Sequence, residues 1–382
     1  MRTIYTSCLM TIAALAVATS CGKSDTPAAA SGPVDVRLVV SSGNNTRVGS
    51  DKTDNDIRQL RVYAFKGDTK VGYAEADNLK GQNYIPITLS EDGEINFYVI
   101  ANDNFGPRPT SVTDWTSLSK TDLESLKFDL SEFGGWSATN DFVSPMSNNR
   151  YDEFGNPLEN DTGKAYENDY GTAVNVTKPT SGSLVIPVTV QHVLGRLRLM
   201  LNKDASAKDV TIKVTKAVVY HRPDAFKLYF SYGEKDKIDD VITFTNNAKP
   251  LTEQLIDASN AVTLDVKPDD GYTTIARTYL APNQYGSSDP DTYTAQKTDG
   301  TTSSNGLNEA YCLELTVEFA YSTGTSEIKE TKNYTVYLPR VPRNTSIDVQ
   351  GTFKGTVVDI KPTFNIMVNA WVERPIEIPA FE

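Results

Sequence analysis

Apolar and polar residues alternate with a period of two along most of this chain. Turn residues such as Glu91-Asp92-Gly93 and Thr323-Gly324 separate one alternating run from the next. The clearest runs lie at residues 34–40, 60–64, 95–101, 184–190, 197–201, 212–214, 313–319, 334–338 and 347–353. Because successive side chains of a strand point to opposite faces, each run predicts a half-buried strand. Strands at this density predict an all-β fold of two β-sandwich domains in tandem.

One short helix and two long loops interrupt this pattern. Either Ser119 or Thr121 is placed to cap the helix. Its apolar residues recur at helical spacing and are Leu123, Leu126 and Leu130. Residues 133–178 and 284–308 are polar and have no periodicity, which predicts long surface loops.

The change from one sandwich to the next is predicted near Pro187. The predicted segments are a leader (1–20), a tether with the first strand (21–47), an N-terminal domain (48–187), a C-terminal domain (188–361) and a C-terminal segment (362–382). The leader is indicated by an apolar run at 9–18 that is too short to span a bilayer and has the length of a signal-peptide core. It closes on Ala18-Thr19-Ser20-Cys21, which predicts cleavage before Cys21 and lipidation (palmitate) of Cys21. The alternative is an ordinary secretory signal beside a chance cysteine.

Charge and composition exclude several classes of partner and site. The chain carries 49 acidic and 37 basic side chains, a formal net charge of −12, which argues against a nucleic-acid partner. Cys8 lies in the leader and Cys21 is the lipid site, so Cys312 has no partner for a disulfide and is predicted to be an inert thiol. With His192 and His221 as the only histidines, a zinc site is not expected.

No catalytic motif is present. The chain lacks a Gly-rich phosphate loop and a Gly-x-Ser-x-Gly turn. Paired carboxylates such as Asp239-Asp240 could serve in glycoside hydrolysis, but in a chain with 49 acidic residues such pairs are expected on solvated loops. Loops at 152–156 and 289–291 offer oxygen ligands but lack the spacing of a calcium loop. We therefore predict no enzyme activity, no cofactor and no metal site.

The two ends of the chain carry matching features. The first strand is followed by a Gly- and Asn-rich stretch at 42–50 that displays Arg47, a predicted site of proteolysis between Arg47 and Val48. Cleavage there would remove the first strand and leave an unpaired sheet edge. The last segment could fill it, because its alternating apolar residues continue past residue 370. The residues of this predicted donor strand are Phe364, Ile366, Val368, Ala370, Trp371, Val372, Ile376 and Ile378. The alternative for residues 364–373, less favoured on pattern alone, is a final strand of the protein's own sheet.

Several short stretches, taken in order, resemble the fimbrillins, the structural subunits of the type V pili of Bacteroidia. They are Ile57-Arg58-Gln59-Leu60-Arg61-Val62-Tyr63-Ala64-Phe65, Phe97-Tyr98-Val99-Ile100-Ala101-Asn102, Val190-Gln191-His192-Val193-Leu194-Gly195-Arg196-Leu197, Pro342-Arg343-Asn344-Thr345-Ser346-Ile347-Asp348-Val349 and Asn369-Ala370-Trp371. The third departs from the family pattern, in which an arginine precedes the one matched here by Arg196. The resemblance covers nearly the whole chain after the leader.

The resemblance implies two transthyretin-like β-sandwich domains and a role as a polymerising stalk subunit in adhesion and biofilm. The precursor would be a lipoprotein of the outer membrane, and an arginine-specific maturation protease would cut after Arg47. The C-terminal strand of an adjoining subunit would then replace the departed strand in the extracellular fimbrium. Implied partners are identical or related pilin subunits, anchor and tip subunits, and a host or bacterial surface ligand.

Two alternatives stay open at this point. The chain is an anchor or tip subunit of the same kind of pilus, or it is a surface glycan-binding lipoprotein. A glycan-binding protein would use an aromatic platform formed by Trp115, Trp136 and Tyr151. In a pilus subunit the same residues are expected to be buried anchors of the loops.

Overall fold

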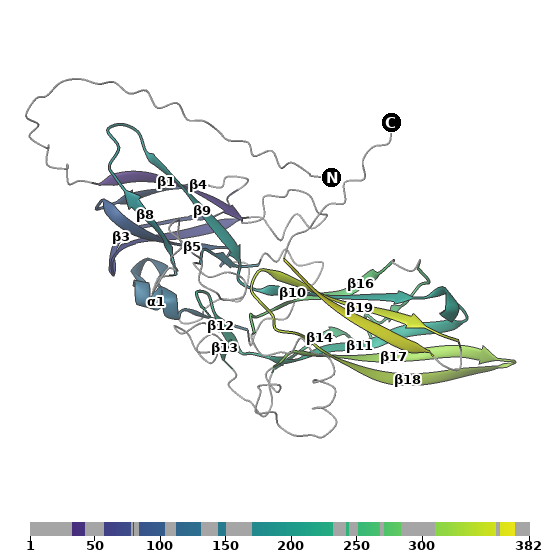
Figure 1. Cartoon of the computed structure of the whole chain (residues 1–382). Helices are drawn as coiled ribbons and strands as arrows, with labels where there is room; N and C mark the ends of the chain where they lie inside the picture. The colour runs from purple at the N-terminus through teal and green to yellow at the C-terminus, as the bar shows by residue number, and fades with distance from the viewer. Residues whose placement is uncertain are drawn as a thin grey trace, which may run out of the picture.

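The computed structural model describes residues 33–42, 57–77, 79, 84–103, 112–130, 144–149, 170–231, 242–243, 251–267, 271–283, 310–356 and 360–370. Nearly all regular structure in these residues is β-strand, arranged as two layered units that meet end to end (Figure 1). The predicted all-β tandem fold is confirmed.

The first unit contains the strands of the N-terminal half. In order across the sheet they are β3 (Thr69–Asp77), β2 (Gln59–Lys66), β5 (Gly93–Ala101), β7 (Met146–Ser147), β9 (Leu184–His192), β1 (Val34–Ser42) and β4 (Tyr84–Leu89). β8 (Thr172–Val176) pairs with the first half of β5, and β7 pairs with its end. The apolar side chains of β1, β4 and β9 share one core with those of β2 and β5.

β2 and β5 are buried on both faces, which the expectation of half-buried strands did not foresee. The sandwich core takes Leu60, Val62 and Ala64 of β2, whereas Tyr63 and Phe65 on its other face join a second, aromatic cluster. These strands therefore read as nearly continuous apolar runs because a second layer covers their outer face.

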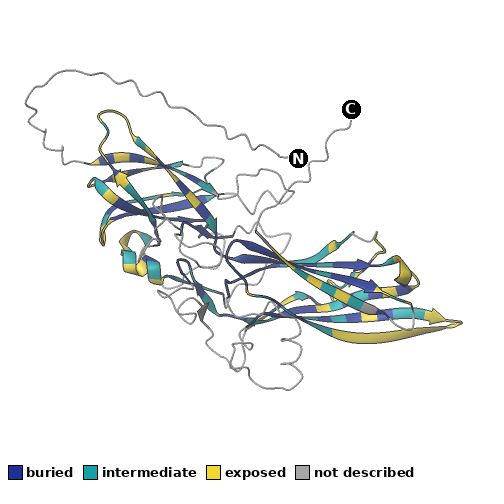
Figure 2. Ribbon diagram, in the orientation of Figure 1, coloured by how far each residue is buried: buried dark blue, intermediate teal, exposed yellow. Residues whose placement is uncertain are grey.

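The second unit consists of two facing sheets. One contains β16 (Thr273–Leu280), β10 (Gly195–Lys203), β19 (Thr345–Lys354) and β20 (Lys361–Ala370). The other contains β14 (Leu251–Ile256), β11 (Val210–Arg222), β17 (Cys312–Thr323) and β18 (Ser326–Tyr337), with β15 (Val262–Thr263) paired to β11. Their inner faces form one core, while most of β18 extends beyond it into solvent (Figure 2). A short 3-10 helix, Ala205–Ala207, joins β10 to β11.

A small sheet joins the two units. β6 (Lys127–Asp129) from the first half pairs with β12 (Ala225–Lys227), which also pairs with β13 (Ile242–Thr243). β9 ends at His192 and β10 begins at Gly195, so only Val193 and Leu194 separate the main strands of the two units. The aromatic cluster beneath this junction takes residues from both halves, including Tyr98, Phe128 and Tyr229.

The predicted helix is α1 (Lys120–Ser125), preceded by a 3-10 helix, Trp115–Ser117. Ser119 is its cap: the Asp122 N–H donates to Ser119 Oγ at 3.1 Å, and the Ser119 N–H donates to Asp122 Oδ2 at 2.9 Å. The expectation that helical spacing continues to Leu130 was wrong, because residues 127–129 form β6 and pair with β12. Leu126 and Leu130 are nevertheless buried, since both enter the junction cluster.

Candidate functional site: the first strand, the last strand and the junction

β1 is an interior strand of its sheet. It runs parallel to β9 and antiparallel to β4, with Leu38 opposite Ile186 on one side and Ile85 on the other. Its inward side chains, Val34, Val36, Leu38 and Val40, are almost completely buried. We call the space between β4 and β9 that β1 occupies the β1 slot. Without β1, both neighbouring strands would lose their backbone partner and the core would be opened along its length.

The outward face of β1 fixes its register in the slot. The Thr88 hydroxyl donates to Asp35 at 2.8 Å, and the guanidinium carbon of Arg37 lies 4.5 Å from the centroid of the Tyr84 ring. Both contacts bridge β1 and β4 across exposed positions, where a cross-strand pair contributes well under about 1 kcal/mol. Burial of the inner face is therefore the main source of β1 binding.

The predicted processing residues lie outside the described part of the chain. Cys21, Arg47 and Val48 belong to this group, so the structure does not test lipidation or cleavage. β1 ends at Ser42, five residues before Arg47, which places the expected cut shortly after the strand that would leave.

The predicted donor strand begins within β20, which pairs antiparallel with β19 of the same chain. Phe364 and Ile366 pack against the core of the second unit, and the Phe364 ring lies 6.1 Å from that of Tyr334, centroid to centroid. Val368 and its neighbour Met367 are 42% and 40% exposed. Ala370 is the last residue of β20. The remaining predicted donor residues, Trp371, Val372, Ile376 and Ile378, lie outside the described residues.

Arg343 links the two units from a fully buried position. Its Nη2 donates to the Ser147 carbonyl at 3.2 Å, to the Ser147 hydroxyl at 3.1 Å and to the Gln191 carbonyl at 3.2 Å. Its guanidinium also lies over the Phe230 ring. Because Ser147 and Gln191 belong to β7 and β9, an arginine of the second unit holds the ends of two strands of the first.

His192 lies beside this arginine and is held neutral. Burial lowers the pKa of His192 to about 3, and the positive charges of Arg196 and Arg343 act in the same direction. The side chain of His192 is almost completely buried. Cys312 is buried, as expected for an inert thiol.

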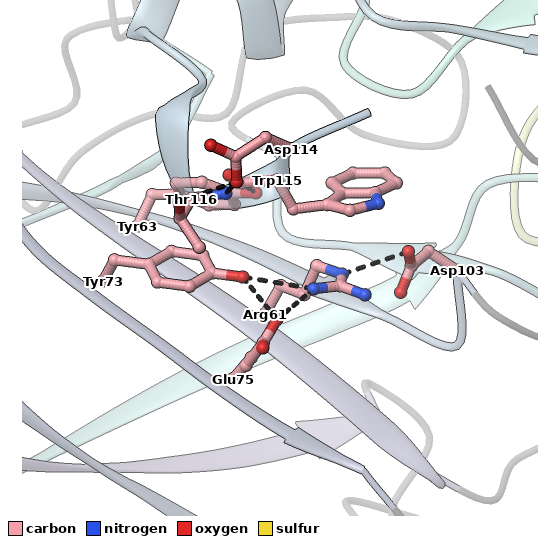
Figure 3. Close-up of polar contacts among 8 residues, drawn as sticks. All are labelled: Arg61, Tyr63, Tyr73, Glu75, Asp103, Asp114, Trp115 and Thr116. Atoms are coloured by element: carbon pink, nitrogen blue, oxygen red, sulfur yellow. Dashed lines mark hydrogen bonds and ion pairs between the residues drawn. The ribbon is translucent and has the colours of Figure 1, made fainter. Parts of the chain in front are cut away.

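A second buried arginine, Arg61, lies on the outer face of β2 (Figure 3). Its Nε donates to Asp103 at 3.1 Å, and its Nη1 donates to the Tyr73 hydroxyl at 3.1 Å and to Glu75. Burial alone would lower the pKa of Arg61, but the charge of Asp103 and the hydrogen bonds to Tyr73 and Asp103 outweigh it and raise the pKa. Arg61 therefore stays protonated and acts as a fixed cation.

Trp115 covers this cation. The guanidinium carbon of Arg61 lies 4.7 Å from the centroid of the Trp115 ring, and the Tyr63 hydroxyl donates to the Trp115 carbonyl at 2.9 Å (Figure 3). Asp114 caps the adjoining 3-10 helix by accepting from the Thr116 N–H. Trp115 is thus an anchor that holds the segment before α1 onto the sheet. The other two aromatic residues of the glycan platform, Trp136 and Tyr151, lie outside the described residues.

The described residues offer no arrangement typical of catalysis. No group of three or more potential metal-ligating side chains occurs among them, and none of their helices has the length and apolarity to cross a bilayer. Asp239-Asp240 and the loops at 152–156 and 289–291 lie outside the described part. What the described residues do provide is a strand enclosed between two neighbours and a rigid junction behind it.

Comparison with known proteins identifies this arrangement. Residues 33–184, from the residue before β1 to the first residue of β9, match the sequence model of a family described as "Major fimbrial subunit protein (FimA)". Residues 33–184, about two fifths of the chain, therefore carry the sequence pattern of the fimbrillin family. The matched segment contains β1 and every strand of the first unit up to the start of β9, so β1 is part of the fimbrillin pattern. The family is one of structural subunits of the extracellular fimbrium and not an enzyme class.

Solved structures share the fold of this chain. A fimbrilin from Porphyromonas gingivalis W83 is 13% identical with a TM-score of 0.51, over 89% of this chain and 98% of that one. A proposed cell adhesion protein from Bacteroides eggerthii gives the same identity and TM-score, over 89% and 96%. Another from Parabacteroides distasonis is 13% identical with a TM-score of 0.50, over 90% and 98%. None of the curated proteins matches the sequence.

Sequence reasoning did not foresee the contacts of two of the buried arginines, Arg61 and Arg343. Arg343 lies in the stretch Pro342-Arg343-Asn344 that carried part of the resemblance, yet its role as a link between the units was not predicted. The signal available in the sequence was a basic residue between two apolar strands. In the structure the chain turns next to it at Asn344, whose φ is 55°. Arg61 gave a similar signal, a charge in the middle of an otherwise apolar run.

Proposed function

We propose that this fimbrillin is a shaft subunit that polymerises by strand exchange. In this proposal the precursor is exported as a lipoprotein on Cys21, a protease cuts between Arg47 and Val48, and β1 then leaves the slot. The observation that carries the proposal is the position of β1, an interior strand whose chain reaches Arg47 five residues later. A segment of an adjoining fimbrillin enters the vacated slot.

The energy of the exchange supports a durable joint. Burial of one valine or leucine side chain stabilises by about 1.5–3 kcal/mol, so the four inward residues of β1 amount to about 6–12 kcal/mol. A replacing strand must supply a similar set of apolar residues at every second position. Loss of conformational freedom on ordering a free segment opposes this gain, and the backbone hydrogen bonds that the segment forms with β4 and β9 add to it.

The C-terminal segment has the required pattern, and the structure refines which part of it is suited to leave. Phe364 and Ile366 already pack in the core of their own unit, so their withdrawal would open that core. Val368 is largely exposed and lies near the end of β20. We therefore propose that the donor begins at Val368 and continues through Ala370, Val372, Ile376 and Ile378.

The partners in this proposal are other pilin subunits along the shaft, the protease, and anchor and tip subunits at its ends. A shaft subunit needs both a strand that leaves and a strand that enters a neighbour. This chain has an alternating segment at each end, which favours the shaft over the anchor or tip. Adhesion and biofilm support would follow from the assembled fimbrium.

The test treats residues 22–382 with a low dose of trypsin. A new N-terminus at Val48 and a ladder of multimers that survive SDS without boiling are expected. Arg47→Ala should block both, and truncation after Ala370 should permit cleavage but abolish the ladder. A chain that is cut at Arg47 and stays monomeric, or that still polymerises without residues 371–382, would contradict the proposal as stated.

A further inference from the structure

β18 presents an uncovered edge at the side of the second unit. It is the terminal strand of its sheet, and no described strand pairs with its outer edge. Its first eight residues, 326–333, are all exposed, whereas buried residues alternate with less buried ones along most of β17 on its other side (Figures 1 and 2). A strand with one such edge is a template for another strand.

Charges and apolar groups alternate along one face of β18 in a specific order. Ile328, Glu330, Lys332 and Tyr334 point to the same face, because their positions differ by two. Glu330 lies 3.6 Å from Lys332 and accepts from the Tyr321 hydroxyl at 3.2 Å. Ile328 is one of the exposed large apolar residues of the described chain, at 36%.

Two-fold symmetry restricts how two copies of this edge can pair. When two identical strands pair antiparallel about an axis perpendicular to the sheet, one residue lies opposite itself and its neighbours lie opposite each other in mirror order. Centring on Lys329 or on Glu330 places like charges directly opposite, which is destabilising. Centring on Ile328 leaves only residues 326–330 overlapping, because β18 begins at Ser326.

When the pairing is centred on Thr331, charged residues face residues of opposite charge or uncharged residues. Glu330 of one copy then lies opposite Lys332 of the other, twice by symmetry, and Ile328 lies opposite Tyr334. On the reverse face, Lys329 lies opposite Asn333. The overlap covers residues 326–336, and no like charges meet directly.

We propose that the outer edge of β18 is an interaction surface for a second copy of this chain, which pairs with it antiparallel about Thr331. The contact joins subunits side by side, and so it goes beyond the end-to-end joint of the proposed strand exchange. The exposed ion pairs make one contact weak, but contacts repeated along two shafts that lie side by side and run in opposite directions reinforce one another. The same charges oppose the registers centred on Lys329, Glu330 and Lys332, which limits indiscriminate pairing of the edge.

Charge exchange tests the partner. We compare Glu330→Lys, Lys332→Glu and an equimolar mixture of the two by sedimentation velocity at high protein concentration and low salt. The chain used is residues 22–382 carrying Arg47→Ala, so that strand exchange does not contribute. Each variant alone should self-associate about tenfold more weakly than the parent, because two attractive pairs become repulsive. The mixture should recover parental association, because the two lysines of one variant then face the two glutamates of the other.

The matched control is Glu94→Lys, an equal change of charge at an exposed position of β5 in the first unit. It should leave association unchanged. A parent chain that stays monomeric throughout, variants that associate as the parent does, or a mixture no better than its components would overturn the proposal.

Cysteine crosslinking tests the register. Thr331→Cys places two cysteines opposite each other, with Cα atoms about 4.5–5.5 Å apart, within reach of a disulfide. Lys329→Cys places its pair about 13 Å apart. Under mild oxidation Thr331→Cys should form the covalent dimer at least about tenfold faster, a ratio set by this difference in distance. Equal rates, or a faster reaction at position 329, would overturn the assignment.

Discussion

Single buried arginines make many of the polar contacts in the interior of this protein, and they are held in different ways. Arg61 is bound by two carboxylates and covered by an indole ring, whereas Arg343 donates across the junction to carbonyl and hydroxyl oxygens. The alternation of apolar residues predicted where such strands run. It could not predict these arginines' partners, because those lie in segments distant in sequence and brought together only by the fold.

Replacement of Arg343 by methionine should weaken the junction more than any exposed substitution. The change leaves the buried Ser147 and Gln191 carbonyls without this donor, at an expected cost of about 2–4 kcal/mol in the free energy of unfolding. Chemical denaturation measures the change. Arg37→Met, at an exposed position of β1, is the control and should cost under about 1 kcal/mol. Equal losses of unfolding free energy in the two variants would show that Arg343 contributes no more to stability than an exposed arginine.

His192 should make the fold sensitive to acid. Its pKa is about 3 in the folded protein, against an ordinary value of 6.5 for an unperturbed histidine, so the unfolded chain binds the extra proton first. The contribution of neutral His192 is therefore fully present above about pH 6.5 and is lost as the pH falls towards 3. By this linkage, unfolding free energies of the parent should fall between pH 6.5 and 4 by about 2–4 kcal/mol more than those of His192→Gln. Parallel pH profiles would argue against a neutral buried histidine.

At the scale of elements, regular alternation of apolar and polar residues predicted the positions of strands well, whereas charged residues concealed part of a strand. The predicted strands at 34–40, 95–101, 184–190 and 347–353 all occur. Residues 326–333 were not predicted to be part of a strand, because they are mostly charged or polar and lack apolar alternation. They form a strand because their backbone pairs with β17. β4 was missed because it contains Pro86, which is tolerated there since β4 ends its sheet.

The packing of β20 against the core of the second unit depends on Gly351 of β19. A Cβ at this position would lie 2.6 Å from Leu201 Cδ2 and 2.6 Å from Phe364 Cε1. Gly351→Ala should therefore displace the Phe364 ring and loosen β20, at a cost of about 1–3 kcal/mol. Hydrogen exchange of the β20 amides should accelerate more than that of β10. Thr363→Ala, at an exposed position of β20, is the control and should leave the exchange rates unchanged.

At the scale of the whole molecule, the tandem arrangement was predictable and the junction was not. The alternating runs report local strand faces, so they indicate two sandwiches. The pairing of β6 with β12 joins the two halves of the chain and covers the outer face of β2 and β5. No periodicity within either segment carries that information.

Removal of β1 should leave a fold that a peptide can restore. A chain beginning at Val48 loses the four buried residues of β1, about 6–12 kcal/mol of apolar burial, and should unfold at markedly lower denaturant concentration. A synthetic peptide of residues 33–42 should bind it and raise the unfolding midpoint. The same peptide with Leu38→Asp is the control and should not bind, because it would bury a charge in the slot. Absence of any peptide effect would show that the slot collapses once β1 has gone.

The continuity of β9 with β10 bears on how a shaft under tension would respond. A strand seated in the β1 slot lies alongside β9, which leads through Val193 and Leu194 directly into β10. β10 lies parallel to β19, and β19 pairs with β20, from which the chain departs. The last residue of β20, Ala370, pairs with Thr345 at the start of β19, beside the start of β10, so a pulling force enters and leaves the second unit at the same end. Withdrawal of the chain at Ala370 would therefore open the β19–β20 hydrogen bonds one after another from that end, and β20 would yield before the pairing of β10 with β19.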